Sequence, residues 1–321
     1  MMLLVLIGAA LAMIAVPHVV STRDLTPATA AALWGVALGL RAVLSVFVVA
    51  YVLVVLPATA IFASITDWCW HTALPVAATN VGVMGAWVGQ GATLLPALVL
   101  AVSAALVAAS VLRSARRVRR LVVQEAIGRG PRGSVIVGGA DVFVAVAGFS
   151  RPRLVLSTGA LTQLDDAELA AGIAHEDGHI HRRHRFVVLY AEACRALARF
   201  TPGTDRALAA LFFQLERDAD AWALRRATDP VALASAICKA ASSRTPSLAL
   251  ATLAGAQGIS ARVSGLLDQP ARPPLLRQAC LATLAGLGLA LLIALTAQLP
   301  AVISDGRAHA ALAAMRTACG M

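Results

Sequence analysis

The chain has 321 residues, of which 59% are hydrophobic and 14% charged, and its mean hydropathy is +0.78. These values are untypical of a soluble globular protein and favour an integral membrane protein. The net charge of +10 would suit a nucleic-acid-binding protein, but 23 of the 27 Lys and Arg residues lie in 113–277, and "RSARRVRR" directly follows an apolar stretch. We interpret this uneven charge as a signal of membrane orientation and expect no direct binding of nucleic acid.

Four stretches reach the length of about 20 apolar residues that a transmembrane helix requires. They cover residues 3–20, 42–63, 91–112 and 280–299. The first stretch could instead be a cleaved signal peptide, but no basic residue precedes its apolar part, as one normally does in a signal peptide. We therefore expect a retained helix and four spans.

The distribution of basic residues predicts the orientation of these spans. Loop 64–90 contains no Lys or Arg, whereas 113–277 is rich in both, and basic residues near span ends favour the cytoplasmic side. The segment 113–277 is thus expected in the cytoplasm, with the N-terminus and the tail 300–321 outside the cell membrane. Arg307 and Arg316 in the tail are a weak signal in the opposite sense. Arg41 would lie at the cytoplasmic start of the second span, where its side chain can extend to the interface.

The spans divide the chain into four parts. We predict a three-helix transmembrane region at 1–112, a cytoplasmic domain at 113–277, a fourth transmembrane helix at 278–299 and a short extracytoplasmic tail at 300–321. Cysteines in the cytoplasmic domain should be reduced thiols, whereas Cys69 and Cys319 would both lie outside and could form a bridge.

The segment 113–277 combines strand and helix patterns. Short Val-rich stretches at 134–139, 142–148 and 153–157 predict strands, since Gly, Pro and Asp separate them. One long helix is predicted over 165–197, beginning with a capping box of Asp165 and Glu168. Two further helices are predicted at 205–227 and around 230–242. The fold class expected is therefore an α-helical integral membrane protein with an inserted α+β domain.

The stretch "AHEDGHIHRRH" (174–184) indicates a metal site. His175 and His179 are four residues apart on the predicted helix, so both imidazoles project from one face and can bind a single zinc ion. Glu176 lies beside them without occupying a ligand position, which suits a general base. This H-E-x-x-H pattern is typical of zinc peptidases, although a polar helix face can contain it by chance.

The next helix contains "LERDADAW", which offers the remaining groups of such a site. Glu216 is a candidate third zinc ligand. Asp220, one helical turn later, could accept a hydrogen bond from a ligating imidazole and fix its tautomer. Together these residues predict one Zn²⁺ per chain and a zinc hydrolase.

The quoted motifs, together with three spans before the domain and one after it, resemble the membrane-embedded gluzincin zinc metallopeptidases of the BlaR/MecR type, the beta-lactam-sensor antirepressors. The resemblance implies that His175, His179 and Glu216 bind zinc, that Glu176 is the base and that Asp220 supports a ligand. HtpX-type membrane peptidases share both motifs. The sensors carry a penicillin-binding domain after the fourth span. In this sequence only 22 residues follow that span, and they contain no S-x-x-K element, so beta-lactam sensing is not expected.

The function predicted is an integral-membrane zinc endopeptidase that cleaves a cytoplasmic or membrane-associated protein. By the resemblance, a DNA-binding repressor is the first candidate substrate, and an HtpX-like quality-control protease or a non-catalytic scaffold are alternatives. A transporter is disfavoured, because Arg41 is nearly the only ionisable residue in the spans.

Three further expectations concern the surroundings of the site. We expect His181 and His184 on a solvated basic face, Tyr190 or Arg217 as an oxyanion stabiliser, and a free substrate-binding edge on strand 153–157. Gly178, inside the motif, makes room for close packing or for substrate.

Overall fold

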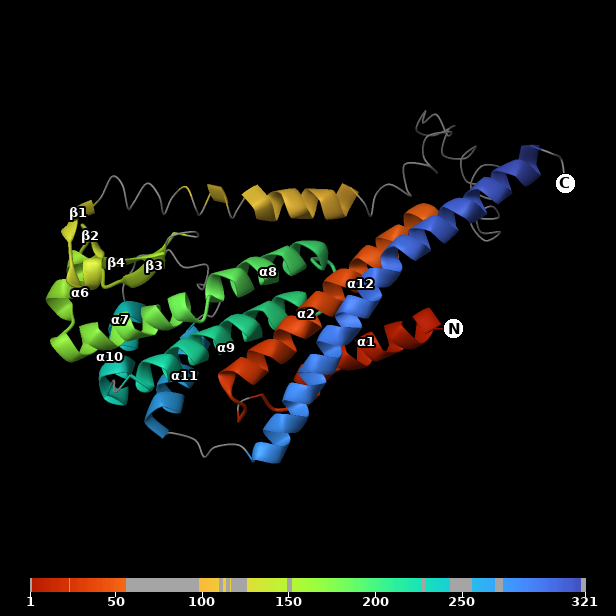
Figure 1. The fold of residues 1–321 in the computed structure, drawn as a ribbon. Coiled ribbons are helices and arrows are strands. Elements are labelled where there is room, and N and C mark those ends of the chain that lie inside the picture. The colour runs from red at the N-terminus through yellow and green to blue at the C-terminus, as the bar shows by residue number, and fades with distance from the viewer. Residues whose placement is uncertain are drawn as a thin grey trace, which may run out of the picture.

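The computed structural model describes residues 2–22, 24–55, 98–109, 112–113, 116, 126–148, 152–226, 229–242, 256–268 and 274–318. Long apolar helices gather at one end of the molecule, and a small sheet with shorter helices lies at the other (Figure 1). This arrangement agrees with the expected combination of membrane helices and an α+β domain.

Three described helices are long and apolar enough to cross a membrane. They lie in α1 (Met2–Val19), in α2 (Pro27–Ala50) with its π-helical extension η1 (Tyr51–Val55), and in the first part of α12 (Leu275–Ala318). The predicted third span, 91–112, lies partly outside the described residues, and its described part is the short helix Leu98–Ala109. Loop 64–90, most of the arginine run at 113–120, Cys69 and Cys319 also lie outside them. The spans suggest a membrane protein, while the count of four and the orientation remain predictions.

Helix α2 begins 15 residues before the predicted second span. Pro27 occupies the first turn, where proline fits because the N–H it lacks would have no partner there. The helix forms this early because its first half is buried by other helices of the chain. The Arg41 side chain does not extend outward as expected: it is buried, donates to the Ala37 carbonyl over 3.2 Å and lies 2.8 Å from His18 Nε2.

Four short strands form one mixed sheet in the order β1-β2-β4-β3. Strands β2 (Val135–Val137), β3 (Val144–Ala147) and β4 (Arg153–Ser157) confirm the three predicted strands, and β1 (Ala126–Arg129) adds a fourth. The 3₁₀ turn η4 (Pro131–Gly133) joins β1 to β2, which pair antiparallel, whereas β2 and β4 are parallel.

The prediction that strand 153–157 offers a free edge is wrong. Strand β4 pairs with β2 on one side and antiparallel with β3 on the other. It takes the central place because its residues after Arg153 are buried and can pack on both faces. Within the described sheet, β3 is the strand beside the motif helix that has an unpaired edge.

The helices after β4 are α6 (Thr158–Gln163), α7 (Asp166–His181), α8 (His184–Leu197), α9 (Thr204–Leu224), α10 (Pro230–Ser242) and α11 (Ala256–Asp268). The capping box is confirmed: Asp165 accepts from the Glu168 N–H, and Glu168 accepts from the Asp165 N–H. The single helix predicted over 165–197 is wrong. It divides at Arg182 and Arg183, and Arg183 adopts a left-handed conformation with φ of 55°.

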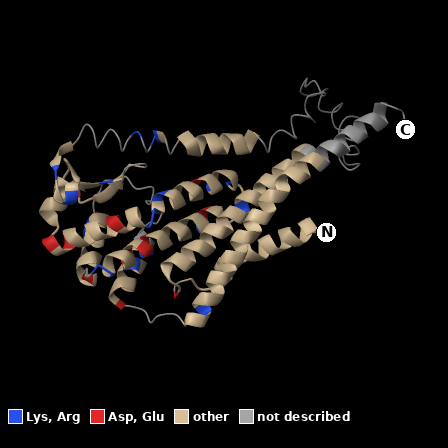
Figure 2. Cartoon of the chain, in the orientation of Figure 1, with Lys and Arg blue, Asp and Glu red and all other residues tan. Residues whose placement is uncertain are grey.

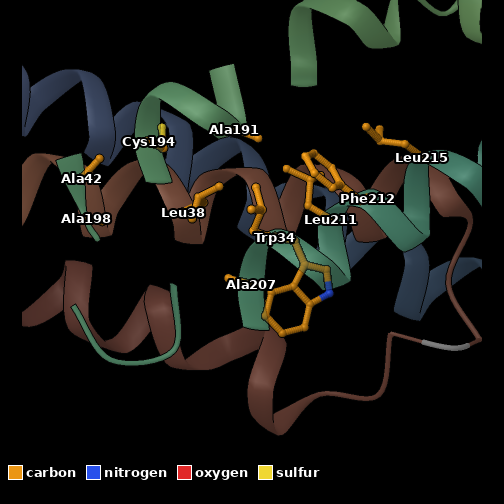
Figure 3. Packing of buried hydrophobic residues seen from close by; sticks show 11 residues of the cluster. Trp34, Leu38, Ala42, Ala191, Cys194, Ala198, Ala207, Leu211, Phe212 and Leu215 are labelled. Carbon is orange, nitrogen blue, oxygen red and sulfur yellow. The ribbon is translucent and has the colours of Figure 1, made fainter. Parts of the chain in front are cut away.

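The largest apolar core joins α2 to the helices of the motif domain. Trp34, Leu38 and Ala42 of α2 pack against a set from α8, α9 and the turn between them (Figure 3), namely Ala191, Cys194, Ala198, Ala207, Leu208, Leu211, Phe212 and Leu215. A side chain at Gly39 of α2 would collide with the Tyr190 hydroxyl of α8, so glycine permits this close approach. A separate cluster joins α1, α2 and α12.

Charged residues are concentrated in the part that contains α6 to α11, and the long apolar helices carry few of them (Figure 2). The long apolar helices and the domain with α6 to α11 therefore differ in their content of charged residues, and α2 packs against helices of both.

Candidate metal centre

Helix α7 places two imidazoles on one face, and α9 brings a carboxylate to them. His175 Nε2 and His179 Nε2 lie 3.2 Å apart. Glu216 Oε2 lies 3.5 Å from His175 Nε2, and Glu216 Oε1 lies 3.4 Å from His179 Nε2. Among the described residues these three form a group whose ligand atoms are close enough to share one metal ion. The structure thus brings together the three ligands predicted from the sequence.

The spacing of these atoms fits zinc. With ligands at about 2.0–2.1 Å in a tetrahedron, neighbouring ligand atoms lie about 3.3–3.4 Å apart. The two imidazole nitrogens lie 3.2 Å apart, and each has a Glu216 oxygen nearby, Oε2 at 3.5 Å from His175 and Oε1 at 3.4 Å from His179, which are distances close to that value. Two imidazole nitrogens and a carboxylate are also a donor set that zinc prefers.

Gly178 explains how α9 comes so close to α7. A Cβ atom at Gly178 would lie 3.1 Å from Ala219 Cα, 3.2 Å from Trp222 Cβ and 3.3 Å from the Ala219 carbonyl oxygen. Of the two roles expected for this glycine, the structure shows close packing. Since Ala219 is three residues after Glu216, the missing side chain at 178 lets the third ligand reach the histidines.

The second imidazole nitrogen of His175, Nδ1, lies beside a buried ion pair of Asp220 and Arg262. His175 Nδ1 lies 2.8 Å from Asp220 Oδ1, which is the contact expected for a carboxylate that orients a metal-binding imidazole. Arg262, from α11, donates to both Asp220 oxygens, from Nε over 2.8 Å and from Nη2 over 2.7 Å. It also donates to Glu216 Oε2 over 2.7 Å. The sequence reasoning missed Arg262, because no local pattern links α11 to the motif.

His184 lies beside His179. The expectation that it lies on a solvated basic face is therefore wrong. Its Nδ1 is 2.9 Å from His179 Nδ1, and its Nε2 is 3.3 Å from Asp218 Oδ2. The break between α7 and α8 makes this possible: in one continuous helix a residue five positions after His179 would project about 140° away. Asp218, His184 and His179 therefore form a buried chain of polar contacts that ends at the metal centre.

Burial and charge shift the titration of these groups in different directions. Burial lowers the pKa of His179 to about 3, so this imidazole stays neutral as a metal ligand must. Burial opposes charge on His175 too, but the carboxylates of Asp220 and Glu216 raise its pKa to about 10. Burial would raise the pKa of Glu216, yet His175, His179 and Arg262 lower it below its usual range. Glu216 is thus an anion, and metal binding must displace a proton from His175.

Glu176 lies between the metal centre and the sheet. Burial raises the pKa of its carboxyl to about 7, and the carboxyl accepts a hydrogen bond from the backbone N–H of Val146 in β3. A carboxyl that titrates near neutral pH can both accept and return a proton, as a general base must.

The other expected site residues lie elsewhere. Tyr190 donates to the Gly35 carbonyl of α2 over 3.0 Å, and Arg217 donates to Gln214 Oε1 over 2.9 Å. His181 stacks on Trp222 and is exposed, as expected. Asp177, which had no assigned role, forms an ion pair with Arg132 at 2.7 Å.

Comparison with known proteins agrees with this geometry. Residues 113–245 match the model of peptidase family M48, whose members are zinc metallopeptidases. The matched segment is less than half of the chain, but it includes α7 and α9 with all three candidate ligands. The comparison with curated proteins found no match, and neither did the comparison with solved structures. A membrane-associated chain with an M48-type metallopeptidase segment is what these findings support.

Proposed function

We propose that the chain is an integral-membrane zinc endopeptidase in which His175, His179 and Glu216 hold the metal. The observation that carries the proposal is that one ligand atom from each of these three residues lies within 4.8 Å of the other two, with the imidazole nitrogens 3.2 Å apart. Zinc bound there would supply Lewis acidity, which polarises a peptide carbonyl and activates water.

Glu176 is proposed as the general base. Its carboxylate would accept the proton of the attacking water and deliver it to the leaving amine nitrogen, so the same side chain serves both halves of hydrolysis. Asp220 would hold His175 in the tautomer that presents Nε2 to the metal, and His184 would do the same for His179. The unpaired edge of β3 lies beside Glu176, and an extended substrate would add to that edge through backbone hydrogen bonds.

We further propose that this domain faces the cytoplasm and cleaves a protein at or near the inner membrane surface. The charge asymmetry of the sequence supports this side, and the packing of α8 and α9 on α2 keeps the site close to the membrane helices. The resemblance to the antirepressor peptidases makes a DNA-binding repressor the first candidate substrate. An HtpX-like role in the degradation of damaged membrane proteins is the alternative.

Metal analysis of the purified full chain tests the ligand set. Wild-type protein should contain close to one zinc per chain, and the double variant His175→Ala, His179→Ala should contain almost none. His181→Ala is the matched control, because His181 is an exposed histidine of the same helix that stacks on Trp222 outside the cluster. Zinc retained by the double variant, or lost from the control, would contradict the assignment.

The Glu176→Gln variant tests the reaction. It should keep zinc but lose peptidase activity by a factor of about 10² to 10⁴, because the amide cannot accept a proton. Comparison of the proteins in membrane and cytosol of cells that express wild type or Glu176→Gln should then reveal substrates as species that accumulate uncleaved with the variant. Activity of the variant within a factor of about two of wild type would rule out Glu176 as the base.

A further inference from the structure

The turn between α8 and α9, residues 198–203, lies against the second half of helix α2. Thr201 Oγ1 lies 2.7 Å from Ser45 Oγ, and a side chain at Gly203 would come within 3.4 Å of Arg41 Nη2. Arg41 and Ser45 lie on consecutive turns of α2. The turn therefore sits at the height of residues 41–45 in a helix that is long and apolar enough to cross a membrane.

Helix α1 shows where this height lies relative to a bilayer. Its 18 residues are about 27 Å long, close to the roughly 30 Å of a hydrocarbon core, so its two ends should lie near the two membrane surfaces. His18, at its C-terminal end, lies 2.8 Å from Arg41 Nη2 and packs edge-on against Trp34 with ring centroids 4.9 Å apart. Arg and Trp are typical of the ends of membrane spans. If α1 spans the bilayer, the α8–α9 turn is therefore level with the surface at which α1 ends.

The chemistry of the turn fits that position. Phe200 is 73% exposed, more than any other large hydrophobic residue described in 184–224. Arg199 and Arg206 flank it and are also exposed, and Asp205 is the single carboxylate in 198–206. An exposed aromatic between arginines combines insertion into the apolar layer with attraction to anionic headgroups.

We propose that this turn is a membrane-surface anchor of the peptidase domain: Phe200 inserts below the headgroups, and Arg199 and Arg206 bind the phosphates of anionic phospholipids. The anchor rests on α1 and α2 being membrane spans and does not depend on the catalytic activity.

The anchor sets the distance between the bilayer and the metal centre. Helix α8 runs from His184, which contacts His179, to Leu197 just before the turn, and its 14 residues extend about 21 Å. With the turn held at the surface, the metal centre stands no more than about that distance beyond it, plus the length of the side chains. This position favours cleavage of protein segments close to the membrane.

Depth-dependent fluorescence quenching tests the anchor. The full chain is used with Cys69, Cys238, Cys280 and Cys319 changed to Ser and the buried Cys194 retained, and an environment-sensitive fluorophore is attached at Phe200→Cys. The protein is placed in nanodiscs of phosphatidylcholine and phosphatidylglycerol that carry spin-labelled lipid. Val231→Cys is the matched control, because Val231 is 61% exposed on α10, which packs against α7 and α11.

The probe at 200 should emit at shorter wavelength and be quenched by spin-labelled lipid, whereas the probe at 231 should behave as in water. Quenching by spin-labelled phosphatidylglycerol should exceed quenching by the phosphatidylcholine analogue, and this preference should fall by roughly fivefold for each arginine of the pair changed to Ser. A probe at 200 that is quenched no more than the probe at 231 would overturn the proposal. So would a buried probe that lipid quenchers cannot reach, because another segment of the chain would then cover Phe200.

A second measurement uses the unmodified chain. Amide hydrogen exchange in peptides that cover 198–206 should slow when phosphatidylglycerol replaces part of the phosphatidylcholine, while peptides from 229–242 should be unaffected. Equal exchange of 198–206 in both lipids, together with equal quenching by both spin-labelled lipids, would show that the arginines do not bind anionic headgroups.

Discussion

The replacement of Gly178 by Ala tests whether the approach of α9 to α7 builds the metal centre. Alanine improves intrinsic helix stability by about 1 kcal/mol over glycine in a helix interior. Against this, the new Cβ would lie 3.1–3.3 Å from atoms of Ala219 and Trp222, tighter than an ordinary contact, and overpacking of this kind typically costs about 1–3 kcal/mol. We therefore expect a net loss of about 0–2 kcal/mol in the free energy of unfolding.

Gly172→Ala is the internal control, since it lies in the same helix with a different surrounding. A Cβ at Gly172 would meet Val144 at 3.5 Å, an ordinary van der Waals contact, so the gain in helix stability of up to about 1 kcal/mol should be retained. The two variants receive the same added methyl group. Any difference between them reports the packing at each position.

The variants are compared by thermal unfolding of the metal-free protein in detergent and by competition for zinc with a chelator. Gly178→Ala should melt below Gly172→Ala. It should also bind zinc about tenfold more weakly than wild type, because the shift of α9 moves Glu216 away from His175 and His179, an effect comparable to other disturbances around metal ligands. Zinc affinity equal to wild type in a Gly178→Ala protein that is as stable as Gly172→Ala would refute the reasoning.

Three further predictions concern two residues that contact the candidate ligands and one that caps the helix carrying two of them. His184→Ala should weaken zinc binding by about 10- to 100-fold, measured by chelator competition, because His179 loses the partner of its Nδ1; unchanged affinity would mean that His184 only fills space. Asp220→Ala should weaken zinc binding by a similar factor of about 10 to 100, and equal affinity would remove its assigned role. Glu168→Gln should lower stability at neutral pH by about 2 kcal/mol, since the carboxylate accepts from Ser235 and Lys239. Those hydrogen bonds lower the pKa of Glu168 from 4.5 to about 2, so its contribution is complete above pH 4.5 and is lost as the pH falls toward 2. Melting temperatures of wild type and Glu168→Gln should therefore converge over that range, and a constant difference would contradict this origin.

Local patterns in the sequence were sufficient to predict much of this protein. The four-residue spacing of His175 and His179 needs only a helix to bring both rings to one face. The capping box of Asp165 and Glu168 marks the start of that helix, and short Val-rich stretches between turn residues predict β2, β3 and β4. These features depend on contacts within a few residues, and short-range geometry is the same in any fold.

The tertiary structure decided the features that join distant segments. Arg262 reaches Glu216 and Asp220 from a helix about 40 residues later in the chain, and no periodicity predicts which helix will carry the balancing charge. Strand β4 is central because β2 pairs with it in parallel, a choice that depends on the path of the chain between the strands. His184 becomes a partner of His179 only because Arg183 takes a left-handed conformation that ends α7, and the contacts with Asp218 that accompany this break come from another helix. Arg41, expected at a lipid surface, is enclosed because α1 and the α8–α9 turn meet there, and burial of a charge is a property of all the elements around it.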